Sequence, residues 1–178
     1  IITCIISFIA AFAAAWILGF DEPAEPDQAK KETKPTAKPA SRPTTVAAPI
    51  NGTCIPLSDV NDAVFSQKIL GDGAAIIPSE GKVYAPVNGT VSTVFDTKHA
   101  IGLLSKDGLE LLIHIGIDTV NLEGKYFTAH VESGQKIKPG DLLVSFDQEQ
   151  IQKEGYDTVT PVLITNTAKF HSIHTNAS

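Results

Sequence analysis

Hydrophobic residues occur in two different arrangements along this chain. Positions 1–20 carry no charged residue, whereas from Ile50 onward short apolar runs alternate with polar residues, Gly and Pro. Twenty consecutive uncharged, mostly apolar positions are long enough for a helix that crosses a bilayer, and short alternating runs between turn residues are typical of β-strands. The pattern predicts a fragment of a transmembrane helix and, further along, an all-β domain.

The predicted strands of the second part are short and closely spaced. They cover residues 53–57, 74–78, 82–87, 90–95, 101–104, 109–113, 125–131, 141–146 and 161–165. Such strands favour an antiparallel β-sandwich or a barrel-sandwich hybrid. Only residues 147–155, with an Asp cap, good helix formers and a terminal Gly, are predicted to be helical. We expect a single core over residues 50–178.

Residues 21–49 form a segment with almost nothing to bury. They are rich in Pro, Ala, Thr and charge, and such a segment cannot offset the entropy lost on ordering, so we expect a semi-extended tether. Its basic residues favour a cytoplasmic location for this side of the membrane. Because the chain opens on Ile, we interpret residues 1–20 as the last span of a longer membrane portion.

Charge and cysteine content narrow the function classes. A net charge of -6 and a pI near 5.3 argue against a nucleic-acid partner, which would need a basic face. Cys4 and Cys54 lie in separate parts of the chain, so no disulfide is expected, and the sequence has no zinc-ligand spacing such as C-x-x-C. Proteins and small ligands remain as possible binding partners.

Two histidines flank a predicted β-hairpin. His99 precedes the run at 101–104, and His114 follows the run at 109–113, with Ser-Lys-Asp-Gly between the runs. A loop of two or four residues would place the two histidines opposite each other or one diagonal step apart, on one face, with Cβ atoms roughly 4.5 to 8 Å apart. A three-residue loop would shift the register by one and place the rings on opposite faces.

The residues around His114 resemble a known family. The run LELLIHIGIDTV at 109–120 is similar to the active-site strand of the IIA domain of the glucose family of the bacterial sugar phosphotransferase system, and further similar blocks follow the same order. These blocks cover residues 62–78, 82–91, 95–100, 132–141 and 160–166. The resemblance implies the C-terminal part of a β-glucoside/sucrose-type multidomain permease in the cell membrane.

The resemblance also implies a domain order and a chemistry. Residues 1–20 would end the transmembrane IIC portion, residues 21–49 would be a linker, and residues 50–178 would be a cytoplasmic IIA domain. In such proteins the histidine matching His114 accepts a phosphoryl group from the phosphocarrier protein HPr and passes it to a cysteine of a IIB domain. His99 would hydrogen-bond the phosphoryl oxygens, and Thr97 would hold the tautomer of His99 or relay a proton.

No cofactor is implied besides the covalent phosphohistidine. The sequence has no P-loop pattern, so a phosphoprotein is the expected donor. Transfer between proteins needs a docking face that excludes water. By matching position, its apolar rim would be formed by Val64, Phe65, Ile69, Leu70, Phe95, Leu112 and Val120, although Val64 and Ile69 fit a place in the core equally well. Asp62 and Asp118 would pair with basic residues of HPr, unless Asp118 only caps a turn.

Two other functions are open at this point. The same apolar face would suit a regulatory protein-binding module, in which His99 and His114 share a Zn²⁺ with a carboxylate of the partner. A zinc hydrolase would need a third protein ligand and a general base, and neither an H-x-H nor an H-E-x-x-H pattern occurs. His171 and His174 lie near the C-terminus without a carboxylate partner and are interpreted as part of a surface tail.

Overall fold

The computed structural model describes residues 45–170 and 172–174. The predicted span at 1–20 and positions 21–44 of the predicted tether lie outside these residues, as does His171. Within the described ranges, no helix has both the length and the apolar character needed to cross a bilayer.

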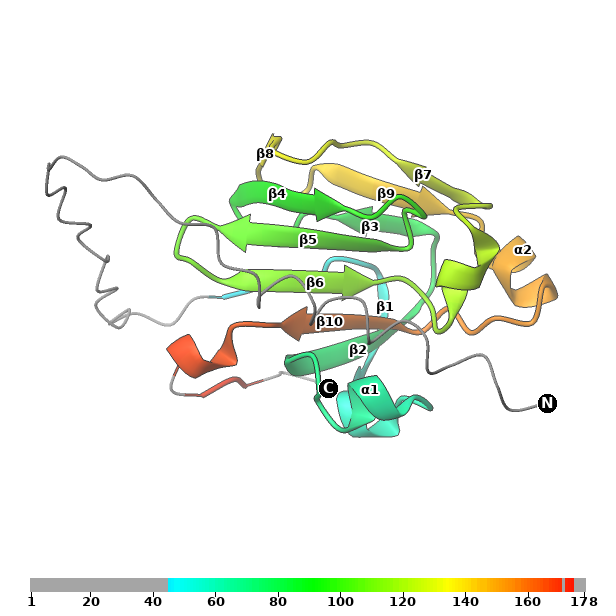
Figure 1. Cartoon of the computed structure of the whole chain (residues 1–178), viewed down its shortest axis with the longest axis horizontal. Helices are drawn as coiled ribbons and strands as arrows, with labels where there is room; N and C mark the ends of the chain where they lie inside the picture. The colour runs from blue at the N-terminus through cyan, green and yellow to red at the C-terminus, as the bar shows by residue number, and fades with distance from the viewer. Residues whose placement is uncertain (1–44, 171, 175–178) are drawn as a thin grey trace, which may run out of the picture. The chain divides into compact units, whose positions relative to one another are not determined.

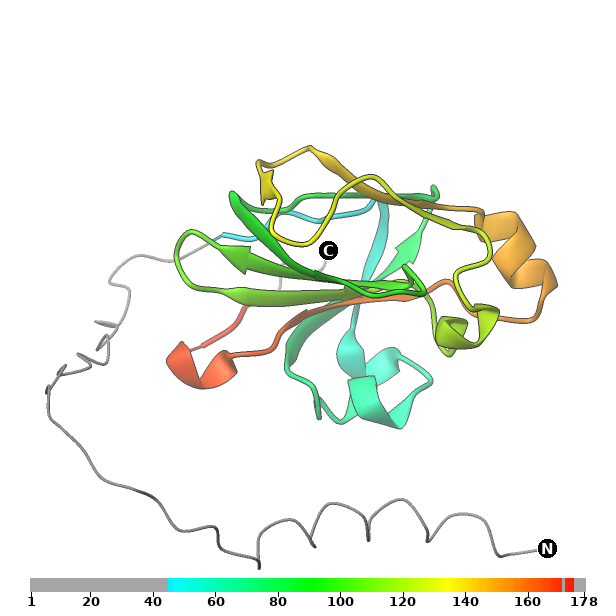
Figure 2. The same cartoon turned by 45° about the horizontal axis from the view of Figure 1, so that its top comes forward.

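Two antiparallel sheets pack face to face, as predicted (Figure 1). The larger sheet has seven strands in the order β1 (Gly52–Pro56), β2 (Asp72–Pro78), β10 (Thr160–Ile164), β6 (Glu110–His114), β5 (Ala100–Ser105), β4 (Gly89–Val94) and β8 (Lys136–Ile137). The smaller sheet has the order β3 (Lys82–Tyr84), β9 (Leu142–Phe146) and β7 (Phe127–Ala129). Figure 2 shows the two layers in profile.

Short helices complete the described domain. The predicted helix is present as α2 (Gln148–Lys153), and three 3-10 turns occur as η1 (Leu57–Asp59), η2 (Thr119–Leu122) and η3 (Thr167–Lys169). The sequence analysis missed strand β8 and helix α1 (Ala63–Ser66). Four residues are too few to show a helical period, and α1 is defined by its cap, because the Asp62 carboxylate accepts hydrogen bonds from the amides of Val64 and Phe65.

The large sheet buries apolar side chains on both faces. Between the sheets, alternate residues of β5 and β6 such as Ile101 and Ile113 are fully buried in the main core. A second cluster forms on the opposite face, where Leu57 of η1 and Phe65 of α1 pack with Leu163 of β10. In Figure 2, α1 lies on the side of the large sheet away from β3, β7 and β9. This second cluster supports the functional site.

The structure decides between the registers that the sequence analysis left open for the β5–β6 hairpin. Its loop contains three residues, because the amide of Ser105 donates to the carbonyl of Leu109 and Ala100 is paired with His114. Of the loop lengths that the sequence left open, the three-residue loop is therefore the one that forms. Gly108 takes the left-handed conformation, with φ 84°, at the third loop position, which is typical of three-residue hairpin loops.

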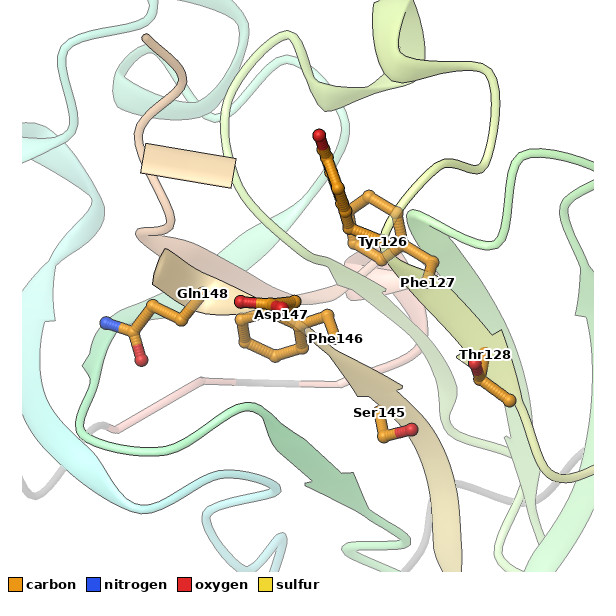
Figure 3. Close-up of a pocket in the computed structure, with 7 residues that line it drawn as sticks. All are labelled: Tyr126, Phe127, Thr128, Ser145, Phe146, Asp147 and Gln148. Carbon is orange, nitrogen blue, oxygen red and sulfur yellow. The ribbon is translucent and has the colours of Figure 1, made fainter. Parts of the chain in front are cut away.

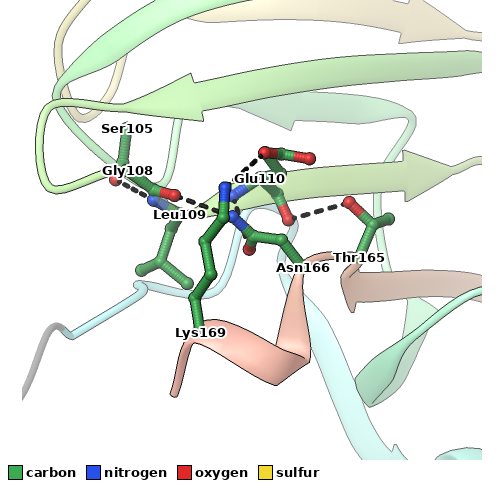
Figure 4. A network of polar contacts seen from close by, with 7 residues as sticks. All are labelled: Ser105, Gly108, Leu109, Glu110, Thr165, Asn166 and Lys169. Atoms are coloured by element: carbon green, nitrogen blue, oxygen red, sulfur yellow. Dashed lines mark hydrogen bonds and ion pairs between the residues drawn. The ribbon is translucent and has the colours of Figure 1, made fainter. Parts of the chain in front are cut away.

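Contacts with the C-terminal segment hold this loop (Figure 4). The Asn166 side chain donates to the carbonyl of Gly108 at 2.8 Å and accepts from the amide of Glu110 at 3.1 Å. The hydroxyl of Thr165 and the ammonium group of Lys169 also contact Glu110. The hairpin register is thus fixed partly by residues more than fifty positions away in the chain.

Candidate active site

The rings of His99 and His114 lie side by side, with centroids 4.8 Å apart and planes at 82°. The observed register alone would not bring them together. His114 pairs with Ala100, and His99 is the residue before Ala100, so a regular strand would place its side chain on the opposite face. His99 precedes β5, and Lys98 directly before it is left-handed with φ 56°. The amide of Ile115 still donates to the carbonyl of His99 at 2.7 Å, so the backbone pairing extends to His99. Its ring nevertheless meets that of His114 despite the shifted register.

His114 is held in one tautomer. Its Nδ1 lies 2.8 Å from the carbonyl oxygen of Gly116, and a carbonyl can only accept, so Nδ1 carries the proton and Nε2 has a free lone pair. Burial lowers the pKa of His114, while the Gly116 carbonyl and the charges of Asp62 and Asp118 oppose this shift. The net direction is downward, which favours the neutral, nucleophilic ring.

His99 is more deeply buried, with 6% of its surface exposed. Burial, together with the charge of His114, lowers the pKa of His99 to about 4, so this ring is neutral at pH 7. Its Nδ1 lies 2.5 Å from the hydroxyl oxygen of Thr97. The contact predicted between Thr97 and His99 is therefore present, and the hydroxyl is placed to fix the tautomer of His99.

Two phenylalanines extend the histidine pair into a row of four rings. Phe65 packs against His114 with a centroid distance of 5.0 Å, and Phe95 packs edge-on against His99 at 5.8 Å. Phe65 is buried, with 5% exposure, so it supports His114 from beneath, while Phe95 is 42% exposed. The sequence analysis placed both at a rim and missed the contact of the Phe65 ring with His114, because α1 itself was not predicted.

Apolar side chains surround the histidines at the surface. The exposed members of the predicted rim, with their exposed fractions, are Val64 (38%), Ile69 (64%), Leu70 (43%), Phe95 (42%) and Val120 (46%). Val64 and Ile69 are thus surface residues, and the alternative that placed them in the core is wrong. Leu112 is half-buried and packs against the second core cluster. Exposed apolar groups of this kind are typical of docking surfaces.

The two aspartates have different roles in the backbone structure. One carboxylate oxygen of Asp62 caps α1. Asp118 is exposed and left-handed, with φ 57°, at the start of η2, and its side chain makes no capping hydrogen bond. The alternative that Asp118 serves to cap a turn is therefore not supported by its contacts, and its carboxylate is free to meet a partner.

No complete metal centre is formed by residues 45–170 and 172–174, which contain no group of three or more His, Cys, Asp or Glu side chains close enough to bind an ion. His99 and His114 could supply two ligands at most, so a Zn²⁺ here would need ligands from a partner. A separate depression of about 590 Å³ lies between β7, β9 and the start of α2 (Figure 3), and neither histidine lines it. Among the described residues, the histidine pair is the candidate site for chemistry.

Comparison with known proteins gives consistent matches. The sequence profile of the family described as phosphoenolpyruvate-dependent sugar phosphotransferase system, EIIA 1, matches residues 44–170. The PTS system beta-glucoside-specific EIIBCA component of Bacillus subtilis (strain 168) is 50% identical over 167 residues, which cover 93% of this chain and 26% of that protein. This chain thus spans about a quarter of the length of that relative.

A solved structure is also similar. The glucose permease IIA from Mycoplasma capricolum is 44% identical, with a TM-score of 0.66, and the match covers 68% of this chain and 79% of that chain. The sandwich described above is therefore also the fold of that protein.

Proposed function

Because this chain belongs to the EIIA 1 family of the phosphoenolpyruvate-dependent sugar phosphotransferase system, we propose that His114 is its phosphoryl carrier. In this proposal His114 accepts the phosphoryl group from phosphorylated HPr and passes it to a cysteine of a IIB domain. The observation that carries the assignment is the hydrogen bond from His114 Nδ1 to the Gly116 carbonyl, which leaves Nε2 unprotonated beside a second histidine.

The transfer needs little covalent work from the protein. The Nε2 lone pair of His114 attacks phosphorus, and the bond between phosphorus and the donor atom breaks with its electron pair leaving on the donor. The Gly116 carbonyl supports the proton on Nδ1 as positive charge develops on the ring. In the second step the cysteine thiolate attacks phosphorus, and the P–Nε2 bond breaks to restore the neutral imidazole.

His99 would orient and stabilise the phosphoryl group. Its pKa of about 4 keeps the ring neutral, so it acts as a hydrogen-bond donor through Nε2–H when Thr97 donates to Nδ1. The Thr97–His99 contact allows this arrangement. A neutral donor stabilises phosphoryl oxygens in the transition state without trapping the phosphorylated state as strongly as a cation would.

The exposed apolar residues around the histidines would dock both protein partners. Contact with HPr or IIB would cover Val64, Ile69, Phe95 and neighbouring side chains and remove water that could hydrolyse phosphohistidine. Asp118, with its free carboxylate, would meet a basic residue of HPr. These roles follow from the exposure of the side chains and from the predicted docking face.

The rest of the relay would lie in the same polypeptide. The Bacillus subtilis relative is an EIIBCA component, and residues 1–20 have the length and apolar character expected for the end of a IIC portion. In that arrangement the domain lies on the cytoplasmic side of the cell membrane. Tethering would raise its concentration near IIB to the millimolar range.

The exposed apolar face also supports a second candidate function, regulation by docking to another protein. In this alternative, Zn²⁺ bound by His99, His114 and a carboxylate of the partner would stabilise the complex. Phosphorylation of His114 would then release the partner. The domain itself would need no cofactor for the relay.

The proposal is tested with purified domain, Enzyme I, HPr and labelled phosphoenolpyruvate. We expect acid-labile label on the wild-type protein and on His130→Ala, a control at an exposed histidine that bonds Ser145 away from the site. His114→Ala should take up no label, and His99→Ala should keep label without passing it to a IIB domain. Absence of label from the wild type would contradict the relay and leave the docking function.

A further inference from the structure

The carbonyl of Gly116 has to be held in place if it is to fix the tautomer of His114. Gly116 is left-handed, with φ 78°, in the connection between β6 and η2. On its far side, the amide of Ile117 donates to the carbonyl of Asp157 at 2.9 Å. A Cβ at position 116 would lie 2.6 Å from the carbonyl oxygen of Asp157. This connection therefore runs through a tight space.

Thr119 fixes the near side of the same connection. Its side chain is fully buried, and its hydroxyl donates to the carbonyl of Ile115 at 2.5 Å. Its methyl carbon would lie only 2.4 Å from a Cβ at position 116, so Thr119 packs directly against Gly116. One side chain thus bonds the residue before Gly116 and limits the space for Gly116 itself.

From these contacts we infer that Thr119 is a positioning residue for phosphoryl transfer, acting through the Gly116 carbonyl to keep Nε2 of His114 free. The expected change in transfer rate rests on the proposed function, whereas the expected change in the tautomer of His114 does not. Thr119 contacts neither the phosphoryl group nor a partner. Its hydroxyl supplies the hydrogen bond, and its methyl group supplies packing, so the two contributions can be separated by substitution.

The test compares Thr119→Val with Thr119→Ser. Thr119→Val keeps the shape but leaves the buried Ile115 carbonyl without its donor, so the connection shifts and the bond from His114 Nδ1 weakens. We expect ¹⁵N NMR of the His114 ring to show a mixture of tautomers, and phosphorylation by phospho-HPr to slow on the order of 10- to 100-fold. Thr119→Ser keeps the hydroxyl and should retain one tautomer and a rate within about threefold of wild type.

Thr160→Val is the matched control. Thr160 is also fully buried and donates its hydroxyl to a backbone carbonyl, that of Thr158, but it makes no hydrogen bond to the connection that follows His114. Thr160→Val should reproduce any general loss of stability without changing the tautomer of His114. A merely structural role for Thr119 would make the two valine variants behave alike.

Each outcome decides the inference. A folded Thr119→Val protein with a single Nδ1–H tautomer and an unchanged rate would overturn it. If Thr119→Val does not fold, Thr119→Ser decides, because loss of the Nδ1–H tautomer in that variant would show that the hydroxyl is not what matters. The tautomer is read in the unphosphorylated protein, so failure of the relay itself would appear separately, as wild-type protein that takes up no label.

Discussion

His99 and His114 meet with ring centroids 4.8 Å apart although the hairpin that joins them has an odd-numbered loop. The pairing of Ala100 with His114 would send the two side chains to opposite faces of a regular ladder. The backbone pairing extends to His99, whose carbonyl accepts from the amide of Ile115, and the left-handed Lys98 directly precedes His99. The contact between the two rings is therefore a departure from the alternation of a regular ladder, at the end of the hairpin.

Acid should destabilise the domain partly through His99. Its pKa in the folded protein is about 4, against an ordinary value of 6.5, so between these values the unfolded chain binds more protons than the folded one. The contribution of neutral His99 to the free energy of unfolding is therefore fully present near pH 7. It is lost as the pH is lowered towards 4, by up to about 3 kcal/mol.

His99→Gln removes this titration while leaving the carboxylates unchanged. We expect its free energy of unfolding, measured by denaturant titration from pH 7 to pH 4, to fall less steeply than that of the wild type. Parallel curves for the two proteins would mean that His99 is not neutral in the folded state at acidic pH.

Gly116→Ala should destabilise the domain more than Gly155→Ala does. Both glycines are left-handed, with φ 78° and 89°, so each alanine incurs a backbone cost of roughly 1 to 2 kcal/mol. A Cβ at position 155 has nothing within 4 Å, whereas at position 116 it meets Thr119 and the carbonyl of Asp157. We expect the midpoint of urea unfolding to fall about twice as far for Gly116→Ala. Equal shifts of the midpoint for the two variants would show that the connection after His114 moves enough to accommodate a Cβ.

The contacts of Asn166 and Lys169 with the β5–β6 hairpin loop should affect the stability of the domain and not the rate of phosphoryl transfer. Asn166→Ala removes two hydrogen bonds to the backbone, at Gly108 and Glu110, and should cost about 1 to 2 kcal/mol. Lys169→Ala breaks only an exposed ion pair with Glu110 and should cost less than about 0.5 kcal/mol. Thermal unfolding measures the difference.

Both variants should be phosphorylated at the wild-type rate, because the network lies at the loop end of β6 and His114 at the other end (Figures 1 and 4). A slow Asn166→Ala protein that is still folded would show that the hairpin register controls the histidine pair from its far end.

Local patterns were sufficient to predict most elements of the described domain. Alternating runs and turn residues predicted nine of the strands within a few residues, and the Asp147 cap predicted α2. The similarity of the run at 109–120 to a known active-site strand identified His114 as the candidate nucleophile. Helix α1, with four residues, and strand β8, with two, were not predicted because such short elements show no measurable hydrophobic period.

The sequence by itself determined most of the strands, because strand formation depends on residue type and short-range spacing, and its resemblance to the IIA family indicated His114, His99 and the apolar residues that could lie around them. The tertiary structure alone decided that the two rings meet, that Phe65 supports His114 from beneath, and that Gly116 and Thr119 fix the tautomer. The physical reason is that these relations depend on left-handed backbone at Lys98 and Gly116 and on contacts such as those of Asn166 and Asp157, which join residues distant in the chain.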